Sequence, residues 1–163
     1  MLFRSIESHH ADITRHGKDY FLTAYAPTRV NRRPVQHVML RDNDRISLGD
    51  STKLTFHKPS NKSDTAVLRL SHRCRLLQDV SSVVLFRDTC LVGAGGMSHV
   101  RTQDDLGQVV LFERHGGLCA RQTGGSGHLA APVQPVVSGQ TLEFGDLRMT
   151  IKPYAESGRK GAV

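Results

Sequence analysis

The sequence predicts an all-β protein built from two β-sandwich units in tandem, with mostly antiparallel strands. Short segments rich in Val, Ile, Thr, Phe and Tyr alternate with turn residues along the chain, a pattern that is typical of strands. No window of roughly 11 or more residues keeps the apolar period of a capped helix, and residues 71–80 are only a weak candidate. A segment near residue 50 also recurs near residue 145, which indicates a duplicated β-unit.

The first group of predicted strands ends at Pro59. Residues such as His16-Gly17 and Asp42-Asn43-Asp44 separate the segments, and because they tolerate tight turns we expect hairpin-length connections. The five segments are residues 11–15, 19–25, 34–40, 45–49 and 53–57.

A polar stretch without aromatic residues follows at 60–64, and strand-like segments then resume. We therefore expect a first unit at residues 1–59, a linker at 60–64, a second unit at 65–154 and a flexible tail at 155–163. The glycine-rich stretch 124–127 is expected to be a flexible loop. The strands of the second group are predicted at residues 66–70, 82–86, 89–93, 99–102, 108–113, 118–122, 141–145 and 148–152.

The internal repeat is the most informative pattern in the chain. Residues 40–59, LRDNDRISLGDSTKLTFHKP, recur as residues 136–153, VVSGQTLEFGDLRMTIKP, with a strand, a Gly-Asp turn, a return strand and a closing Lys-Pro in both copies. Further upstream, residues 13–17 match residues 112–116. Alternation places Ile46, Leu48, Leu54 and Phe56 toward the core of the first copy, and Leu142, Phe144, Met149 and Ile151 toward that of the second.

Composition excludes several classes of function. No apolar run approaches the roughly 20 residues of a membrane helix, and the charged start does not fit a signal peptide, so we expect a cytoplasmic protein. Three cysteines, Cys74, Cys90 and Cys119, without a CxxC pair indicate reduced thiols. A net charge of +7 favours anionic partners, but the absence of Trp and the scattered basic residues make nucleic acid the weaker choice.

The order of four motifs in residues 1–59 resembles the final two-thirds of the forkhead-associated (FHA) family. These motifs are Ser8-His9-His10-Ala11-Asp12-Ile13, Tyr20-Phe21-Leu22, Thr28-Arg29-Val30-Asn31 and the Leu40 to Gly49 hairpin segment. Residues 65–154 look like a diverged second member, with Ala94 at the place of the family's arginine. The resemblance implies an SMAD/FHA-like β-sandwich that binds phosphothreonine peptides through loops at one end, as signalling modules of this family do.

The resemblance also implies which residues would bind the phosphopeptide. His10 matches the family's structural histidine and Asn31 the Asn of its Val-Asn turn, whereas the phosphate-binding Ser falls on Glu7, with Ser8 one position later. The guanidinium groups of Arg29, Arg32 and Arg33 flank Asn31 and suit phosphate or carboxylate. We therefore expect Ser8, Arg29, Asn31, Arg32 and Arg33 to form the phosphopeptide site, with Arg4 as a further candidate.

Two classes of function remain open at this point. The first is a module that binds a phosphorylated or acidic protein partner; the second is a degenerate FHA scaffold with a structural or assembly role, which Glu7 and Ala94 favour. We find no catalytic constellation, no cofactor motif and no third ligand for a metal at His9-His10, and therefore expect no enzyme, no cofactor and no metal site.

The two copies differ in what precedes their shared segments. In the second copy about 45 residues lie between the predicted linker and the strand that begins at Gln108, whereas the first copy begins directly with the equivalent region. Several opening strands of the second copy therefore have no counterpart in the first. A sandwich without them exposes backbone along a sheet edge, a state that invites strand addition. We therefore expect residues 1–59 to be stabilised by packing on the second unit or by pairing with another copy of the chain, giving a homodimer.

Overall fold

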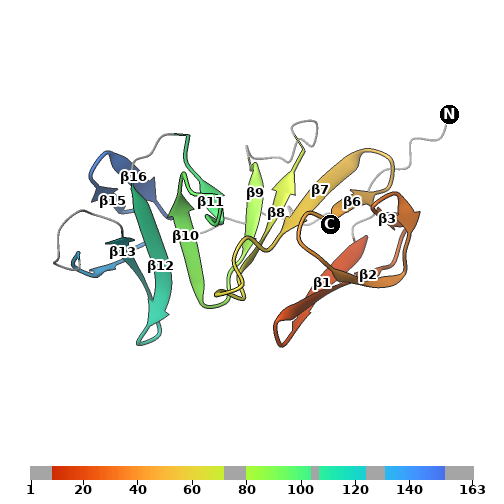
Figure 1. Cartoon of the computed structure of the whole chain (residues 1–163), viewed down its shortest axis with the longest axis horizontal. Coiled ribbons are helices and arrows are strands. Elements are labelled where there is room, and N and C mark those ends of the chain that lie inside the picture. The colour runs from red at the N-terminus through yellow and green to blue at the C-terminus, as the bar shows by residue number, and fades with distance from the viewer. Residues whose placement is uncertain (1–8, 72–79, 104–106, 124–130, 153–163) are drawn as a thin grey trace, which may run out of the picture. The chain divides into compact units, whose positions relative to one another are not determined.

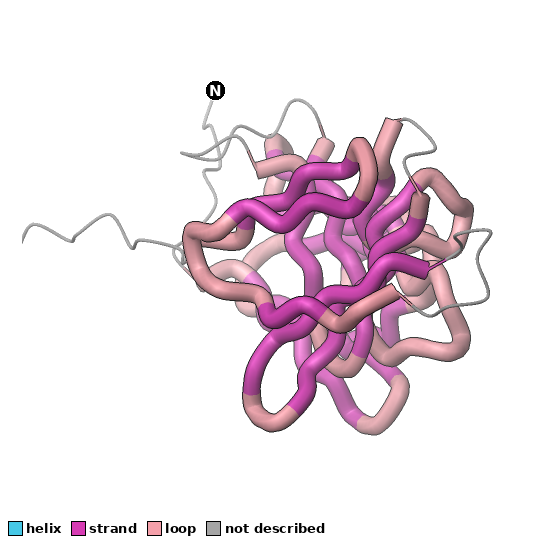
Figure 2. Tube along the Cα trace, turned by 90° about the vertical axis from the view of Figure 1, so that its left-hand side faces the viewer, coloured by secondary structure: helices cyan, strands magenta, loops and turns pink. Residues whose placement is uncertain are grey.

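The computed structural model describes residues 9–71, 80–103, 107–123 and 131–152 and contains only strands and loops in those ranges. Figure 2 shows this all-β architecture, which confirms the predicted fold class. No helix that could cross a membrane occurs in these ranges. The weak helix candidate at 71–80, the glycine loop at 124–127 and the tail at 155–163 lie almost entirely outside the described residues, as do Arg4, Glu7 and Ser8.

The strands follow the predicted segments closely, because alternation and turn residues mark most of them. Three differences stand out: residues 34–40 divide into two strands, and β3 and β14 were not predicted. The strands are β1 (Ala11–His16), β2 (Asp19–Ala24), β3 (Thr28–Val30), β4 (Arg33–Pro34), β5 (His37–Leu40), β6 (Arg45–Leu48), β7 (Thr52–His57), β8 (Ala66–Leu70), β9 (Ser82–Leu85), β10 (Thr89–Gly93), β11 (Val100–Arg101), β12 (Gln108–Arg114), β13 (Gly117–Thr123), β14 (Gln134–Pro135), β15 (Thr141–Phe144) and β16 (Leu147–Thr150).

The chain divides into two compact units, and the division differs from the boundary that the sequence predicts. Unit 1 comprises residues 1–90 and 96–100, and unit 2 comprises residues 91–95 and 101–163. The stretch at 60–64, predicted as a linker between domains, instead joins β7 to β8 inside one sheet of unit 1.

Unit 1 is a sandwich of a three-stranded sheet, in the order β1-β2-β5, and a six-stranded sheet, in the order β4-β3-β6-β7-β8-β9. Its core lies where apolar side chains of the two sheets meet, because alternate residues of each strand face inward. The buried members are Tyr20, Leu22, Val30, Leu40, Ile46, Phe56 and Ala66.

Strands β8 and β9 extend the six-stranded sheet beyond β7, the last strand of the first repeat copy. β8 pairs antiparallel with β7, with Leu54 opposite Leu70 and Phe56 opposite Leu68, and β9 pairs with β8 in turn. Ala66 of β8 is fully buried in the core of unit 1. Figure 1 shows β7, β8 and β9 side by side. The edge of β7 is therefore covered by strands that the sequence assigned to the second unit.

Side-chain hydrogen bonds connect the beginning of β8 to the end of β9. The Tyr20 hydroxyl of β2 donates to the carbonyl oxygens of Asp64, two residues before β8, and of Leu85, the last residue of β9. The Asp88 carboxylate accepts from the hydroxyls of Ser63 and Thr65 at 2.6 and 3.3 Å. These bonds join the two strands of the pair to each other and to the other sheet of unit 1.

Unit 2 contains most of a five-stranded sheet, in the order β11-β10-β12-β13-β14, and the separate β15–β16 hairpin; the first residues of β10 and β11 belong to unit 1. β12 and β13 form a hairpin whose turn residues, His115 and Gly116, both have positive φ. The buried apolar residues of unit 2 are Val92, Val109, Leu111, Ala120, Leu142, Phe144 and Leu147.

The β15–β16 hairpin reproduces the register of β6–β7. Ile46 pairs with Leu54 as Leu142 pairs with Met149, and the flanking pairs correspond in the same way. The turn glycines Gly49 and Gly145 have φ values of 59° and 61°. Outside the hairpins, Asn43 N donates to Phe56 O at 2.8 Å, and Gly139 N donates to Ile151 O at 2.7 Å. The repeat seen in the sequence is therefore also a repeat of backbone geometry in these hairpins.

Candidate anion-binding groove of unit 1

The outer face of the six-stranded sheet carries basic and hydroxyl side chains. Because Ile46 and Leu54 face the core, their neighbours Arg45, Lys53 and Thr55 face the opposite side of β6 and β7. Arg45 lies opposite Thr55, and Lys53 lies opposite Ser47. Arg45 and Lys53 are exposed, so their charges are available to a partner.

A groove of about 580 Å³ lies on this face, next to the turn between β3 and β4. Three of its lining side chains are cationic, from Arg32, Arg45 and Lys53, and none of the described lining residues is acidic. The other lining residues are Asn31, Ile46, Ser47, Leu54, Thr55 and Ser71. Guanidinium, ammonium and hydroxyl groups around one hollow are the donors that bind phosphate or carboxylate.

Asn31 fixes the edge of the groove through bonds within the protein. Its side-chain amide donates to Asp44 Oδ1 at 2.7 Å, and its side-chain oxygen accepts from the backbone N–H of Arg45 at 3.0 Å. The Asp44 carboxylate is buried and also accepts from the backbone N–H of Arg41. Asn31 therefore joins two turns, and its side chain serves to position Arg32 and Arg45.

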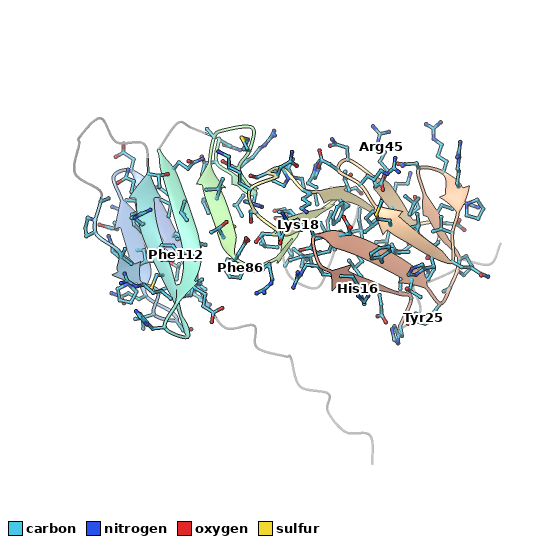
Figure 3. All side chains as sticks on the ribbon, turned by 60° about the horizontal axis from the view of Figure 1, so that its bottom comes forward. His16, Lys18, Tyr25, Arg45, Phe86 and Phe112 are labelled. Atoms are coloured by element: carbon cyan, nitrogen blue, oxygen red, sulfur yellow. The ribbon has the colours of Figure 1, made fainter. Side chains whose placement is uncertain are left out.

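His10 lies at the other end of β3. Its Nε2 donates to the carbonyl oxygen of Pro27 at 3.1 Å, just before β3 begins, whereas Asn31 follows the last residue of β3. Three residues of strand span about 10 Å, so His10 and Asn31 mark two separate surfaces. Figure 3 shows Tyr25, whose backbone N–H bonds to His10, and Arg45 on opposite sides of unit 1.

The surface near His10 is less suited to an anion. The exposed carboxylate of Asp12 accepts from His9 at 2.8 Å and from the hydroxyl of Tyr25 at 3.0 Å. The hydrogen bond from His9, followed by that from Tyr25, lowers the pKa of Asp12, so that this carboxylate keeps its negative charge. Negative charge repels phosphate, and the basic groove is the better anion site.

The structure thus divides the residues that the sequence singled out. Asn31 and Arg32 line the groove, and Arg29 lies beside it, because it is opposite Ser47 in the β3–β6 pairing. Arg33 is exposed on β4, opposite Val30. His10 belongs to the other surface, and Ser8 lies outside the described residues. Arg45 and Lys53 were not among the predicted site residues, although the alternation that places Ile46 and Leu54 in the core also sets Arg45 and Lys53 on the outer face.

The cluster around Asp88 is the nearest approach to a catalytic arrangement. Burial raises the pKa of Asp88, but hydrogen bonds from Ser63, Thr89, Asp64 and Thr65 outweigh this effect and lower it overall. Its hydroxyl partners Ser63 and Thr65 are 3% and 0% exposed, so neither can reach a substrate from solution. We interpret the cluster as structural. In the described ranges, no three His, Cys, Asp or Glu side chains gather as metal ligands would.

One comparison with known proteins gives a match. Residues 3–49 match the family model of the FHA domain, a segment that runs from before β1 to the turn after β6. No curated protein and no solved structure matches the chain. Since the family match ends at residue 49, the assignment of residues 65–154 to a second copy stays a prediction.

Proposed function

We propose that unit 1 binds a phosphothreonine-containing or acidic segment of a protein partner through the basic groove, because residues 3–49 match the family model of the FHA domain and domains of that family are protein-interaction modules. The groove, rather than the surface near His10, is the site of this binding. The proposed residues are Arg32, Arg45 and Lys53, with Arg29 at the margin.

The observation that carries this proposal is the charge of the groove. Arg32, Arg45 and Lys53 converge on it from the β3–β4 turn, β6 and β7, and no acidic side chain among the described residues lines it. Because Asn31 and the paired strands fix the backbones that carry these three side chains, only the side chains themselves have to be ordered on binding. A phosphate group can accept several charge-assisted hydrogen bonds in such a site.

The proposal is tested with a degenerate phosphothreonine peptide library and the same library carrying plain threonine. We expect fluorescence anisotropy to show binding of the phosphorylated library and at least about tenfold weaker binding of the plain one, since a charge-assisted hydrogen bond contributes about 1.5 to 3 kcal/mol. Arg45→Glu and Lys53→Glu should each weaken binding of the phosphorylated library by about tenfold or more.

The matched control is Arg114→Glu, which makes the same change of charge on exposed β12 of unit 2. It should leave peptide binding within about twofold of the unmodified chain once salt screens long-range fields. Equal affinity for the two libraries would contradict phosphate recognition. Equal losses from Arg45→Glu and Arg114→Glu would contradict the groove as the site.

A role in assembly is the second candidate, and one observation favours it. The β15–β16 hairpin forms a sheet of only two strands, so the described residues leave strand edges there without a partner. Such edges are common sites of strand addition.

A further inference from the structure

The edge of β16 is incomplete when compared with the equivalent edge of β7. β8 covers the edge of β7, whereas no described strand pairs with the corresponding edge of β16. The difference shows in strand length: β7 continues through Phe56 and His57, where it pairs with β8. β16 ends at Thr150, and the residues equivalent to those two, Ile151 and Lys152, are not in a strand.

The backbone groups that this edge presents follow from the hydrogen bonds of the repeat. Ile151 O accepts from Gly139 N, so the backbone of Ile151 points toward the β15 side. Successive residues of a strand point to opposite edges, and Arg148, Thr150 and Lys152 therefore direct their N–H and C=O groups to the open edge. Their equivalents in β7 are the residues whose backbones face β8; Lys53 O, for example, accepts from Ser71 N at 3.0 Å.

The residues of β8, which pair with the edge of β7, indicate what kind of strand would pair with the edge of β16. β8 offers Leu68-Arg69-Leu70, which lie opposite Phe56, Thr55 and Leu54 respectively. β16 contains both halves of this pairing. Leu147-Arg148-Met149 matches the β8 triplet, and Met149-Thr150-Ile151 matches the β7 triplet.

We propose that β16 pairs antiparallel with β16 of a second copy of this chain, around a two-fold axis at Met149. The β7–β8 register, transferred to this edge, sets Met149 opposite its symmetry mate, Arg148 opposite Thr150, and Leu147 opposite Ile151. Residues on the apolar face of one copy then meet only residues of the same face, and the interface is self-complementary.

The charges of the residues that would face each other favour an axis at Met149 over an axis one residue later, at Thr150. A two-fold axis at Met149 places Asp146 opposite Lys152, a pair of opposite charges. An axis at Thr150 would place Arg148 opposite Lys152, and like charges directly opposite each other destabilise a sheet. The proposed partner is therefore a second copy of the chain in this one register. The pairing satisfies the backbone hydrogen-bonding groups at the β16 edge of both copies.

The test uses the full chain and changes exposed Thr150, which would face Arg148 of the other copy twice per dimer. Sedimentation equilibrium should show a monomer–dimer equilibrium in the unmodified chain. Thr150→Glu adds two attractive pairs and should tighten the dimer, whereas Thr150→Lys adds two repulsive pairs and should loosen it. The two dissociation constants should differ by about tenfold or more. Both variants lose the same Thr141–Thr150 hydroxyl bond, so simple destabilisation of the hairpin would shift both in the same direction.

A second measurement tests the register. Met149 and its symmetry mate would form a non-hydrogen-bonded pair with Cα atoms about 4.5 Å apart, within the range that a disulfide spans. Met149→Cys should therefore form a covalent dimer under mild oxidation, mapped by mass spectrometry, whereas Arg148→Cys should not. A chain that remains monomeric at millimolar concentration, or a dimer whose affinity responds equally to Thr150→Glu and Thr150→Lys, would overturn the proposal.

Discussion

Asn31 shows how one side chain can be conspicuous in the sequence and yet serve the fold more than the ligand. Its amide reaches Asp44, its oxygen reaches the backbone of Arg45, and its own backbone lies in the left-handed region with φ of 50°. Asparagine tolerates that conformation better than most residues. The Val-Asn motif therefore fixes the turn between β3 and β4, and this turn places Arg32 at the groove.

Substitutions of Asn31 should separate hydrogen bonding from backbone strain. Asn31→Gly removes both side-chain bonds and should lower the free energy of unfolding by about 2 kcal/mol. Asn31→Ala loses the same bonds and adds a left-handed alanine, which should cost about 1 kcal/mol more. Urea unfolding followed by circular dichroism measures both. Unfolding midpoints of Asn31→Ala and Asn31→Gly equal to that of the unmodified chain would show that these contacts contribute nothing.

At the scale of strands, the sequence predicts much of the local structure and misses long-range pairing. Alternating side chains and turn residues located the hairpins of β6–β7 and β15–β16, because both signals are local. Alternation does not reveal which edge a strand will join. β8 has a pattern that suits the β7 edge and the β16 edge alike, so its place in unit 1 and the domain boundary could not be predicted from the sequence.

The residues of the candidate site also divide into those that a local sequence signal predicts and those that depend on strand pairing. The cations of the β3–β4 turn were visible as a charged run around Asn31, and Arg32 does line the groove. Arg45 and Lys53 join it because two strands pair in register, with Arg45 opposite Thr55 and Lys53 opposite Ser47. The ends of β3 also had to be known before His10 could be separated from Asn31.

Amide hydrogen exchange should distinguish the two hairpins. The amide of Thr55 faces β8, whereas that of its equivalent, Thr150, faces the open edge of β16. In protein dilute enough to be monomeric, the Thr55 amide should exchange at least about 100-fold more slowly than the Thr150 amide. The amides of Leu54 and Met149 face the partner strand in each hairpin and serve as internal controls. Similar exchange rates for Thr55 and Thr150 would contradict the pairing of β7 with β8.

At the scale of the whole molecule, the family match covers a segment that does not form a closed sandwich by itself. Residues 3–49 end before β7, and the core of unit 1 includes Phe56 of β7 and Ala66 of β8. Leu68 and Leu85 pack against the same core from β8 and β9. The sequence predicts that residues 1–59 are stabilised by packing on the second unit or by pairing with another copy of the chain; the structure places residues 66–85 of the same chain in the six-stranded sheet, and the homodimer stays a prediction.

Truncation at the two alternative boundaries should give opposite results. A chain of residues 1–59 keeps the match to the family but loses β8 and β9, which exposes the backbone edge of β7 and uncovers Phe56. Since domains of about 60 residues are already marginal, this chain should remain unfolded, with a narrow range of amide proton shifts in NMR spectra. A chain of residues 1–100 retains both strands and the Asp88 cluster and should give dispersed amide shifts and cooperative unfolding.

Complementation supplies the control for that experiment. A synthetic peptide of residues 63–90 carries β8, β9 and the hydrogen-bonding residues Ser63 and Asp88. Added to the 1–59 chain, it should restore the dispersed amide shifts, because it returns both the edge hydrogen bonds and the buried apolar surface. The same peptide with Leu68→Asp, which puts a carboxylate against the core facing Phe56, should not restore them. Cooperative folding of residues 1–59 alone as a monomer would contradict the assignment of β8 and β9 to unit 1.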